Sequence, residues 1–307
     1  MKNKYPHIDL RVIQCDITNF CNLRCIMCTN LKDWKNSDSC DKKVMSDDIW
    51  NKICEVDVKE IWLGFVFEPM VDRSIWHKIT TYNKLHRDTY FPMTTNGIAF
   101  DEMDIKMVED LPFRVINVSL NGGDRSVVNK IMGFHAWNQS WWTIKKLVGK
   151  VHLVISTVFL DQNKESNYRL IDKVSELNSN KISICVGFPN TCLVEVPSSE
   201  EYHHEFKKYK KYGDKKSVEV MQHRKEFDLE GMEEFWKEYN TCPHLWRRIH
   251  INYSGHLILC CEKFISMGNI RDKSIHEVFS GENFSNTRNL SWRNEGPCKG
   301  CRVLSNI

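Results

Sequence analysis

The strongest constraint on the fold is a regular alternation of short apolar segments with amphipathic ones. The apolar segments are rich in β-branched residues and are as short as typical strands. They span residues 11–18, 60–67, 90–95, 114–120, 151–159 and 181–188. Strands that alternate with helices indicate parallel βα units joined by right-handed connections. The sequence therefore predicts the α/β class, with a partial (β/α)6 barrel.

Four of the predicted strands are followed directly by segments that carry turn-forming or reactive residues. A cysteine cluster follows the first strand, and Glu68-Pro69 follows the second. Asn96-Gly97 follows the third strand, and Asn121-Gly122 follows the fourth. In barrels and open parallel sheets, ligands bind at the carboxyl ends of the strands. We therefore expect these four segments to converge on one site.

Composition and charge exclude several classes of protein. The chain has 307 residues, of which 41% are hydrophobic and 27% charged, as in a globular protein of about two domains. A formal net charge of +3 gives little support for a nucleic-acid partner. No apolar stretch approaches the ~20 residues of a membrane span, and residues 1–11 lack the apolar core of a secretion signal. We expect a cytoplasmic protein that binds neither nucleic acid nor membrane.

Changes in composition divide the rest of the chain. Residues 207–225 are rich in Lys and Arg, and residues 226–238 are rich in Asp and Glu. Such charge runs are typical of solvated helix faces, here bridging two domains. The functional alternative is a substrate-facing lid or a surface that binds a partner. Alternating apolar residues around Ser254-Gly255 then predict a β-hairpin. The predicted parts are a barrel core at 1–190, a linker with bridging helices at 191–241 and a small cysteine-rich domain at 242–307.

The 13 cysteines are the most informative residue type. Their odd number and the lack of a secretion signal argue against a disulfide framework and favour metal binding or catalysis. Cys21, Cys25 and Cys28 have C-x3-C-x2-C spacing on one loop, so their thiolates can converge on one soft metal centre. A zinc finger would need a fourth ligand. Three cysteines without a local fourth suit a four-iron cluster with one open iron.

This loop resembles the signature of the radical S-adenosylmethionine (SAM) superfamily, in which the same spacing follows the first strand. Segments 64–69, 94–97 and 118–122 resemble the GEP, TNG and S-x-D-G motifs of that family, with Phe67 in place of a glycine. The resemblance implies that the three cysteines hold a [4Fe–4S] cluster that binds SAM. The residues it implies for SAM binding are Met27, Glu68, Pro69, Asn96, Ser119 and Asn121, with Glu68 in the motif that holds the methionine amino group.

A second cysteine set lies near the end of the chain. Cys242 is followed by twelve residues, Gly255, four residues and Cys260, and then by Cys298-x2-Cys301. On spacing alone, four such cysteines also suit a structural zinc ion. The pattern resembles the SPASM and twitch extensions of radical SAM enzymes. Because no cysteine follows Cys301, it is most similar to the twitch type, which implies one auxiliary cluster, expected to be [4Fe–4S]. Cys261 is an alternative ligand to Cys260.

The resemblance implies an enzyme that reductively cleaves SAM to a 5′-deoxyadenosyl radical, which abstracts a substrate hydrogen. An auxiliary cluster with four cysteine ligands points to electron transfer, and hence to a radical SAM oxidoreductase that performs a two-electron oxidation. Glu262 is the candidate base, and the external electron donor is expected to be a flavodoxin or ferredoxin.

The substrate is expected to be a small molecule or a peptide. The short segment before the first strand leaves no room for a peptide-docking domain, which favours a small molecule; a peptide-modifying maturase is the alternative. A non-catalytic zinc or iron–sulfur scaffold is the alternative of another class.

Overall fold

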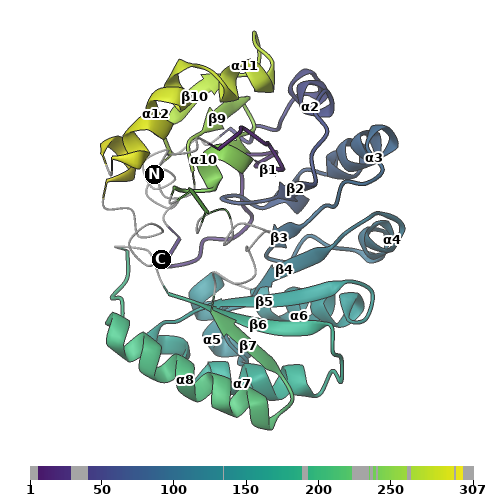
Figure 1. Cartoon of the computed structure of the whole chain (residues 1–307). Coiled ribbons are helices and arrows are strands. Elements are labelled where there is room, and N and C mark those ends of the chain that lie inside the picture. Colours follow the sequence, from purple (N-terminus) through teal and green to yellow (C-terminus); the bar gives the residue numbers. More distant parts are fainter. Residues whose placement is uncertain are drawn as a thin grey trace.

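A computed structural model describes residues 6–28, 41–133, 135–188, 193–222, 235, 238–239, 241–260, 264–293 and 295–299. Its centre is a ten-stranded sheet in the order β10-β9-β8-β1-β2-β3-β4-β5-β6-β7, with helices around the outside (Figure 1). The strands are β1 (Val12–Cys15), β2 (Glu60–Leu63), β3 (Met93–Thr95), β4 (Val115–Ser119), β5 (His152–Val158), β6 (Ile182–Gly187), β7 (Glu219–Gln222), β8 (Arg248–Ile251), β9 (His256–Ile258) and β10 (Ser266–Asn269).

Helices follow most of these strands along the chain. The α-helices are α2 (Asp47–Cys54), α3 (Ile75–Leu85), α4 (Glu102–Asp110), α5 (Arg125–Met132), α6 (Ala136–Leu147), α7 (Lys164–Ser175), α8 (Ser199–Lys215), α10 (His244–Arg247), α11 (Ile275–Phe279) and α12 (Glu282–Trp292). Short 3-10 turns are η1 (Pro69–Val71), η2 (Asp161–Asn163) and η3 (Gly296–Cys298). None of the described helices is long and apolar enough to cross a bilayer.

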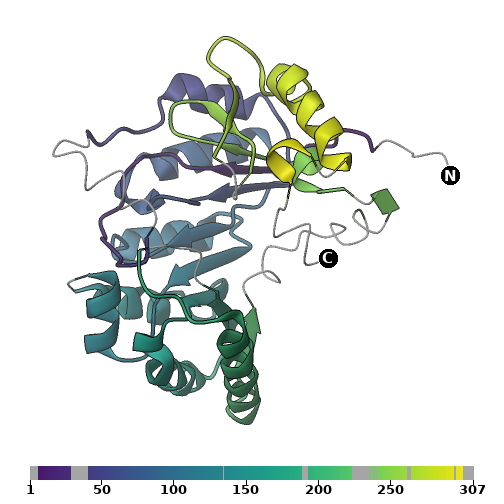
Figure 2. The same ribbon diagram turned by 90° about the vertical axis from the view of Figure 1, so that its left-hand side faces the viewer.

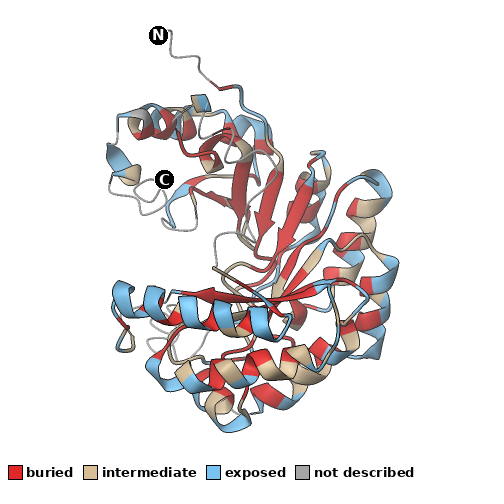
Figure 3. Cartoon of the chain, turned by 60° about the horizontal axis from the view of Figure 1, so that its bottom comes forward, coloured by how far each residue is buried: buried red, intermediate tan, exposed pale blue. Residues whose placement is uncertain are grey.

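The predicted α/β class with a mostly parallel sheet is confirmed. Strands β1 to β7 pair in parallel with their neighbours, and each of the six predicted strand segments contains one of β1 to β6. The sheet curves so that mostly buried strands line its inner side, while the exposed faces of the helices lie outside (Figure 3). Its carboxyl edge therefore gathers the loops that carry the predicted site residues.

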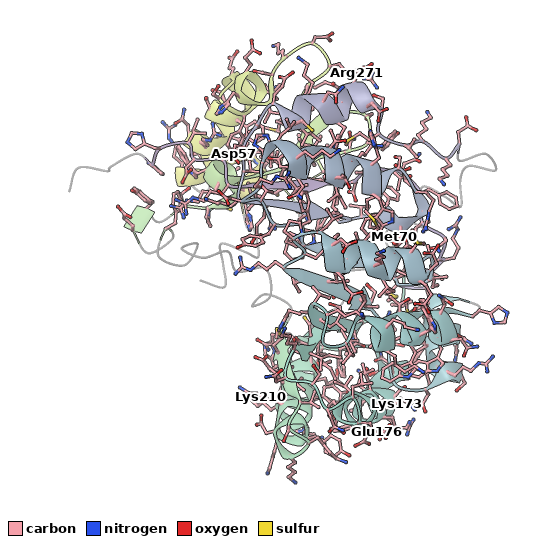
Figure 4. All side chains as sticks on the ribbon, turned by 90° about the vertical axis from the view of Figure 1, so that its right-hand side faces the viewer. Asp57, Met70, Lys173, Glu176, Lys210 and Arg271 are labelled. Carbon is pink, nitrogen blue, oxygen red and sulfur yellow. The ribbon has the colours of Figure 1, made fainter. Side chains whose placement is uncertain are left out.

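The parallel sheet is larger than the six strands we predicted. The segment interpreted as a linker, 191–241, contains α8 but also β7, which pairs with β6 at the edge of the sheet. β7 was missed because only Val220 among its four residues is buried, so the strand has little apolar signal. α8 packs against α7 at this end of the molecule, where Figure 4 labels Lys210 of α8 and Lys173 of α7.

The cysteine-rich segment continues the same sheet at its other end. β8 pairs in parallel with β1, so that His250 lies opposite Gln14, and β9 and β10 follow as antiparallel strands. α11 and α12 pack beside them, at the end of the molecule opposite α8 (Figure 2). The predicted hairpin is present as β8 and β9. This pairing places the segment of the second cysteine set next to the strand that leads into the first.

Candidate iron–sulfur and SAM site

The N-terminal cysteines lie on a loop that follows β1 and rests on the end of α5. The backbone N–H of Ile26 donates to the carbonyl oxygen of Ile131 at 2.9 Å, which anchors the middle of the loop. Cys21, Cys25 and Cys28 are free thiols and are partly exposed. The structure therefore places the three cysteines where the sequence predicted them, at the carboxyl edge of the sheet.

Burial favours the protonated thiol form of Cys21 and Cys25. Burial, then the neighbouring thiols, raises the pKa of Cys25 to about 12. Burial, then Glu68, raises the pKa of Cys21 to about 11. Positively charged iron would reverse this effect, because metal binding deprotonates thiols. The sulfur of Cys21 also accepts from the backbone N–H of Leu23 at 3.4 Å and from Asn96 Nδ2 at 3.8 Å, bonds that suit a thiolate.

The donor set of this loop fits a four-iron cluster. Among the described residues, no three His, Cys, Asp or Glu side chains surround the position of one metal ion. A [4Fe–4S] cluster instead holds each thiolate on a separate iron, so its ligands lie further apart. The donor set and its spacing therefore fit the cluster that the sequence implied.

Glu68 connects the loop after β2 to the end of β3 and the turn that follows it. Its Oε1 accepts from the Thr95 hydroxyl at 2.7 Å and from the backbone N–H of Met70 at 3.1 Å. Its Oε2 accepts from the backbone N–H of Asn96 at 2.6 Å. Burial raises the pKa of Glu68 to about 7, and these three donors oppose the rise. Because both oxygens already have protein partners, Glu68 holds the turn after β3 against the loop after β2.

Asn96 connects that turn to the cysteine loop. Its Nδ2 donates to Asn22 Oδ1 at 2.6 Å and lies 3.8 Å from Cys21 Sγ. Its Oδ1 accepts from the backbone N–H of Ile98 at 2.9 Å, and the backbone carbonyl oxygen of Asn96 accepts from the Ser140 hydroxyl at 2.6 Å. Every polar group of this side chain therefore fixes the turn or its contact with the cysteine loop.

The loop after β2 requires a glycine at its first position only. Gly64 has φ of +75°, and a Cβ there would lie 2.5 Å from the carbonyl oxygen of Thr94 and 2.7 Å from Pro69 Cδ. Pro69 is buried at the start of η1. Phe67, which replaces the glycine of the related motif, does not have a positive φ. The substitution is therefore compatible with the backbone of this loop.

Asp16, which belongs to none of the predicted motifs, organises the same loop. Its Oδ1 accepts from the backbone N–H groups of Phe65 at 2.8 Å, Val66 at 3.0 Å and Phe67 at 3.4 Å. The available signal was its place, since it is an acidic residue directly after an apolar strand. The partners lie about fifty residues away, which no local pattern predicts.

The remaining predicted SAM contacts lie in different surroundings. Asn121 uses its side-chain oxygen to accept the backbone N–H of Val158 at 2.8 Å, which ties the end of β4 to β5. Ser119 ends β4 opposite Ser156 and is partly exposed. Met27 lies on the cysteine loop, partly buried against the core. A role for these three residues toward SAM stays a prediction.

The C-terminal cysteines come from three separate elements. Cys242 is buried just before α10, Cys260 follows β9, and Cys298 ends η3, which packs against α12. Cys261, Glu262 and Cys301 lie outside the described residues.

Several buried polar atoms beside these cysteines fit an anionic group. Among the described residues, Thr241 Oγ1, His244 Nδ1, Arg288 Nη1 and Ser291 Oγ are buried without a hydrogen-bond partner. Buried donors normally have one. Burial, then the Arg248 cation, lowers the pKa of His244 to about 3. An iron–sulfur cluster with thiolate ligands would supply both acceptors and negative charge, so this region fits the auxiliary cluster.

Comparison with known proteins agrees with this reading of the geometry. The family model of the radical SAM superfamily matches residues 16–174, and the model named SPASM, an iron–sulfur cluster-binding domain, matches residues 242–302. No curated protein matches the chain significantly.

Solved structures with a similar fold are distant in sequence. SuiB from Streptococcus suis bound to SAM has a TM-score of 0.71 and 14% identity, covering 92% of this chain and 68% of its own. The enzyme anSMEcpe with SAM and the Cp18Cys peptide has a TM-score of 0.69 and 15% identity, covering 95% and 86%. BtrN with SAM and 2-DOIA has a TM-score of 0.50 and 13% identity, covering 97% and 94%.

The radical SAM model covers more than half of the chain, and its match contains the cysteine loop, Glu68 and Asn96. The SPASM match contains all four C-terminal cysteines that we predicted as ligands. This chain belongs to the radical SAM superfamily and carries a C-terminal SPASM domain.

Proposed function

We propose that this protein is an oxidoreductase that uses a SAM-derived radical to remove a hydrogen atom and passes the second electron to an auxiliary cluster. One observation carries the proposal: the two cysteine-bearing segments flank the same strand. Cys21 lies on the loop that leaves β1, and β8, which follows Cys242 and α10, pairs with β1 along its whole length. Because β1 and β8 are parallel, Cys242 precedes their amino ends and Cys21 follows their carboxyl ends, so a four-residue strand of about 13 Å lies between the two segments. This arrangement supports electron transfer between the two sites.

The N-terminal residues bind and orient the cofactors in this proposal. Cys21, Cys25 and Cys28 would hold the cluster, which, once reduced by an external flavodoxin or ferredoxin, would supply the electron that cleaves bound SAM to the 5′-deoxyadenosyl radical. Glu68 and Asn96 hold the surrounding turns through the bonds described above. Pro69, Met27, Ser119 and Asn121 are the further candidate SAM contacts. The protein thus orients the reactants and excludes water, while the cofactors carry the difficult chemistry.

The C-terminal residues serve the second half of the reaction. Cys242, Cys260, Cys298 and Cys301 are the proposed ligands of one auxiliary cluster, with Thr241, His244, Arg288 and Ser291 as buried groups beside it. Glu262 is the proposed base that takes the substrate proton, because it lies two residues from Cys260 in the sequence.

The favoured substrate is a peptide, and the enzyme is then a maturase. SuiB is solved with its precursor peptide SuiA and anSMEcpe with the Cp18Cys peptide, at TM-scores of 0.70 and 0.69. A small molecule is the second candidate, supported by BtrN with 2-DOIA at the lower TM-score of 0.50.

The first experiment measures iron, sulfide and SAM cleavage after anaerobic reconstitution. Wild type is compared with a variant in which Cys21, Cys25 and Cys28 are all changed to Ala. We expect the variant to keep the iron of the auxiliary cluster and to form no 5′-deoxyadenosine. A variant without any iron would remove the electron relay from the proposal. A wild type that binds no iron would overturn the proposed function itself.

The second experiment separates the two substrate classes. The reconstituted enzyme is incubated with a pool of synthetic peptides that contain Cys and Ser, and the masses are recorded. A SAM-dependent loss of two hydrogen atoms from a peptide supports the maturase. A parallel incubation contains an aminocyclitol in place of the peptides. SAM-dependent oxidation of the aminocyclitol, without any modified peptide in the first incubation, favours the small-molecule enzyme.

A further inference from the structure

A buried carboxylate joins the loop after β2 to the SPASM domain. Asp16 Oδ1 accepts the three backbone N–H groups of residues 65–67, and Asp16 Oδ2 accepts from His250 Nε2 at 2.9 Å. Asp16 is 2% exposed and His250 is 4% exposed. His250 belongs to β8, within the residues that match the SPASM model. One side chain therefore connects two domains.

The three amide bonds set the direction of the loop's carbonyl groups. In a planar trans peptide, the carbonyl points opposite to the N–H. Because the N–H groups of residues 65–67 point to Asp16, the carbonyl oxygens of residues 64–66 point away from it. Carbonyl oxygens are the backbone groups that accept from an ammonium ion. Asp16 thus presents the loop in the orientation that the amino group of SAM requires.

His250 holds Asp16 in this position from the other domain. Its Nε2 carries the proton that Asp16 accepts, since an ionised carboxylate can only accept. Its ring also packs edge-on against Phe65, with centroids 5.1 Å apart, and Phe65 stacks on Phe264 at 6.1 Å. Both Phe264 and His250 come from the SPASM domain. The loop after β2 is therefore held by its own domain on one side and by the SPASM domain on the other.

Loss of His250 would leave one oxygen of a buried carboxylate without its partner. A buried charge must then hydrate, rotate or take up a proton. Rotation moves Oδ1 away from the three amides, and protonation removes the charge that strengthens their bonds. The orientation of the loop therefore depends on a residue that only the folded SPASM domain supplies.

We propose that Asp16 and His250 are positioning residues that make SAM binding at the N-terminal cluster depend on the SPASM domain. The proposal rests on the proposed function, in which the loop after β2 receives SAM. By linkage, occupancy of the SAM site then stabilises the contact between the two domains.

The test measures SAM binding by the fully reconstituted enzyme. SAM affinity is obtained by equilibrium dialysis, and the EPR spectrum of the reduced cluster is recorded before and after SAM addition. The variants are His250→Ala, His250→Gln and, as control, His256→Ala, which removes a partly exposed histidine of β9 whose ring bonds Ser266 and, among the described residues, no other side chain. Glutamine can still donate an N–H toward Asp16, so it serves as the rescue.

We expect His250→Ala to bind SAM about tenfold more weakly, the change typical of losing a charge-assisted hydrogen bond. We expect His250→Gln to lie within about threefold of wild type, and His256→Ala to match it. Iron content should be equal in all variants. A second variant, Asp16→Asn, covers the case in which His250→Ala does not fold, because it keeps an acceptor for the amides but removes the charge.

The proposal is overturned if His250→Ala and Asp16→Asn, with full iron, bind SAM as wild type does and show the same spectral change. It is also overturned if glutamine fails to rescue while His256→Ala loses affinity equally. A wild type that binds SAM but forms no 5′-deoxyadenosine contradicts the proposed function only, because the inference is judged on binding.

Discussion

The two cysteine sites of this protein differ in how their surroundings are satisfied. Around the N-terminal loop, Glu68 and Asn96 bond the neighbouring turns to each other, so the site is organised by the protein itself. Around the C-terminal cysteines, buried polar atoms such as His244 Nδ1 and Arg288 Nη1 have no hydrogen-bond partner in the described part of the chain. The first site is therefore built before its cofactor binds, whereas the second depends on what it holds.

Removal of the N-terminal ligands should have the largest effect on activity and a small one on stability. Changing Cys21, Cys25 and Cys28 together to Ala is expected to abolish 5′-deoxyadenosine formation. We expect the free energy of unfolding to fall by only about 1 kcal/mol, and Tm by roughly 2–4 °C, because the surrounding hydrogen bonds remain. Product analysis and thermal unfolding check both parts. A large loss of Tm would contradict a preorganised site.

Removal of the C-terminal ligands should destabilise the fold more than removal of the N-terminal ligands does. Changing Cys242, Cys260 and Cys298 to Ala leaves the nearby buried donors without acceptors. We expect the free energy of unfolding to fall by about 3 kcal/mol, and Tm by roughly 6–12 °C. Anaerobic thermal unfolding with and without an iron chelator measures this. If the chelator lowers the Tm of wild type by no more than the Cys21, Cys25 and Cys28 substitutions do, the two sites do not differ as we argue.

A single methyl group tests how tightly the first site is packed. Gly64→Ala places a Cβ against Thr94 and Pro69 and strains a positive φ, so we expect a cost of about 3 kcal/mol and loss of SAM binding. Gly149→Ala is the matched control, because its φ is also positive but nothing lies within 4 Å of the new Cβ. We expect it to cost about 1 kcal/mol and to leave SAM binding unchanged. Equal losses in both would show that backbone strain alone matters.

A double-mutant cycle measures the bond between the turn and the cysteine loop. Asn96→Ala and Asn22→Ala each remove the 2.6 Å hydrogen bond, and Asn22→Ala should weaken SAM binding about fivefold, or about 1 kcal/mol. Asn96→Ala should weaken it more, because it also removes the bond from the backbone N–H of Ile98. The double variant should lose little more than Asn96→Ala alone, because the shared bond is already absent there. Full additivity of the two losses would show that the residues act separately.

The strands were predictable from sequence because their buried residues are consecutive, as in Ile182–Gly187. β7 and β10 were not, because Glu219–Gln222 and Ser266–Asn269 have one fully buried residue each and form only through pairing. The cysteine ligands were visible because their spacing is local. Most bonds of Glu68 and Asp16 were not, because, apart from Met70, their partners lie 27 to 234 residues away in the sequence.

The smallest effect is expected where this chain departs from its family. Phe67→Gly restores the glycine of the related motif, but Phe67 has no positive φ, and its N–H is already held by Asp16. A glycine there gains no conformation that the loop needs and loses chain rigidity, at a cost of roughly 0.5–1 kcal/mol. We therefore expect a slightly less stable protein whose SAM affinity, measured by dialysis, stays within about twofold of wild type. Markedly tighter binding would instead mean that the Phe67 ring obstructs the site, and the first site would then be less completely built than its hydrogen bonds indicate.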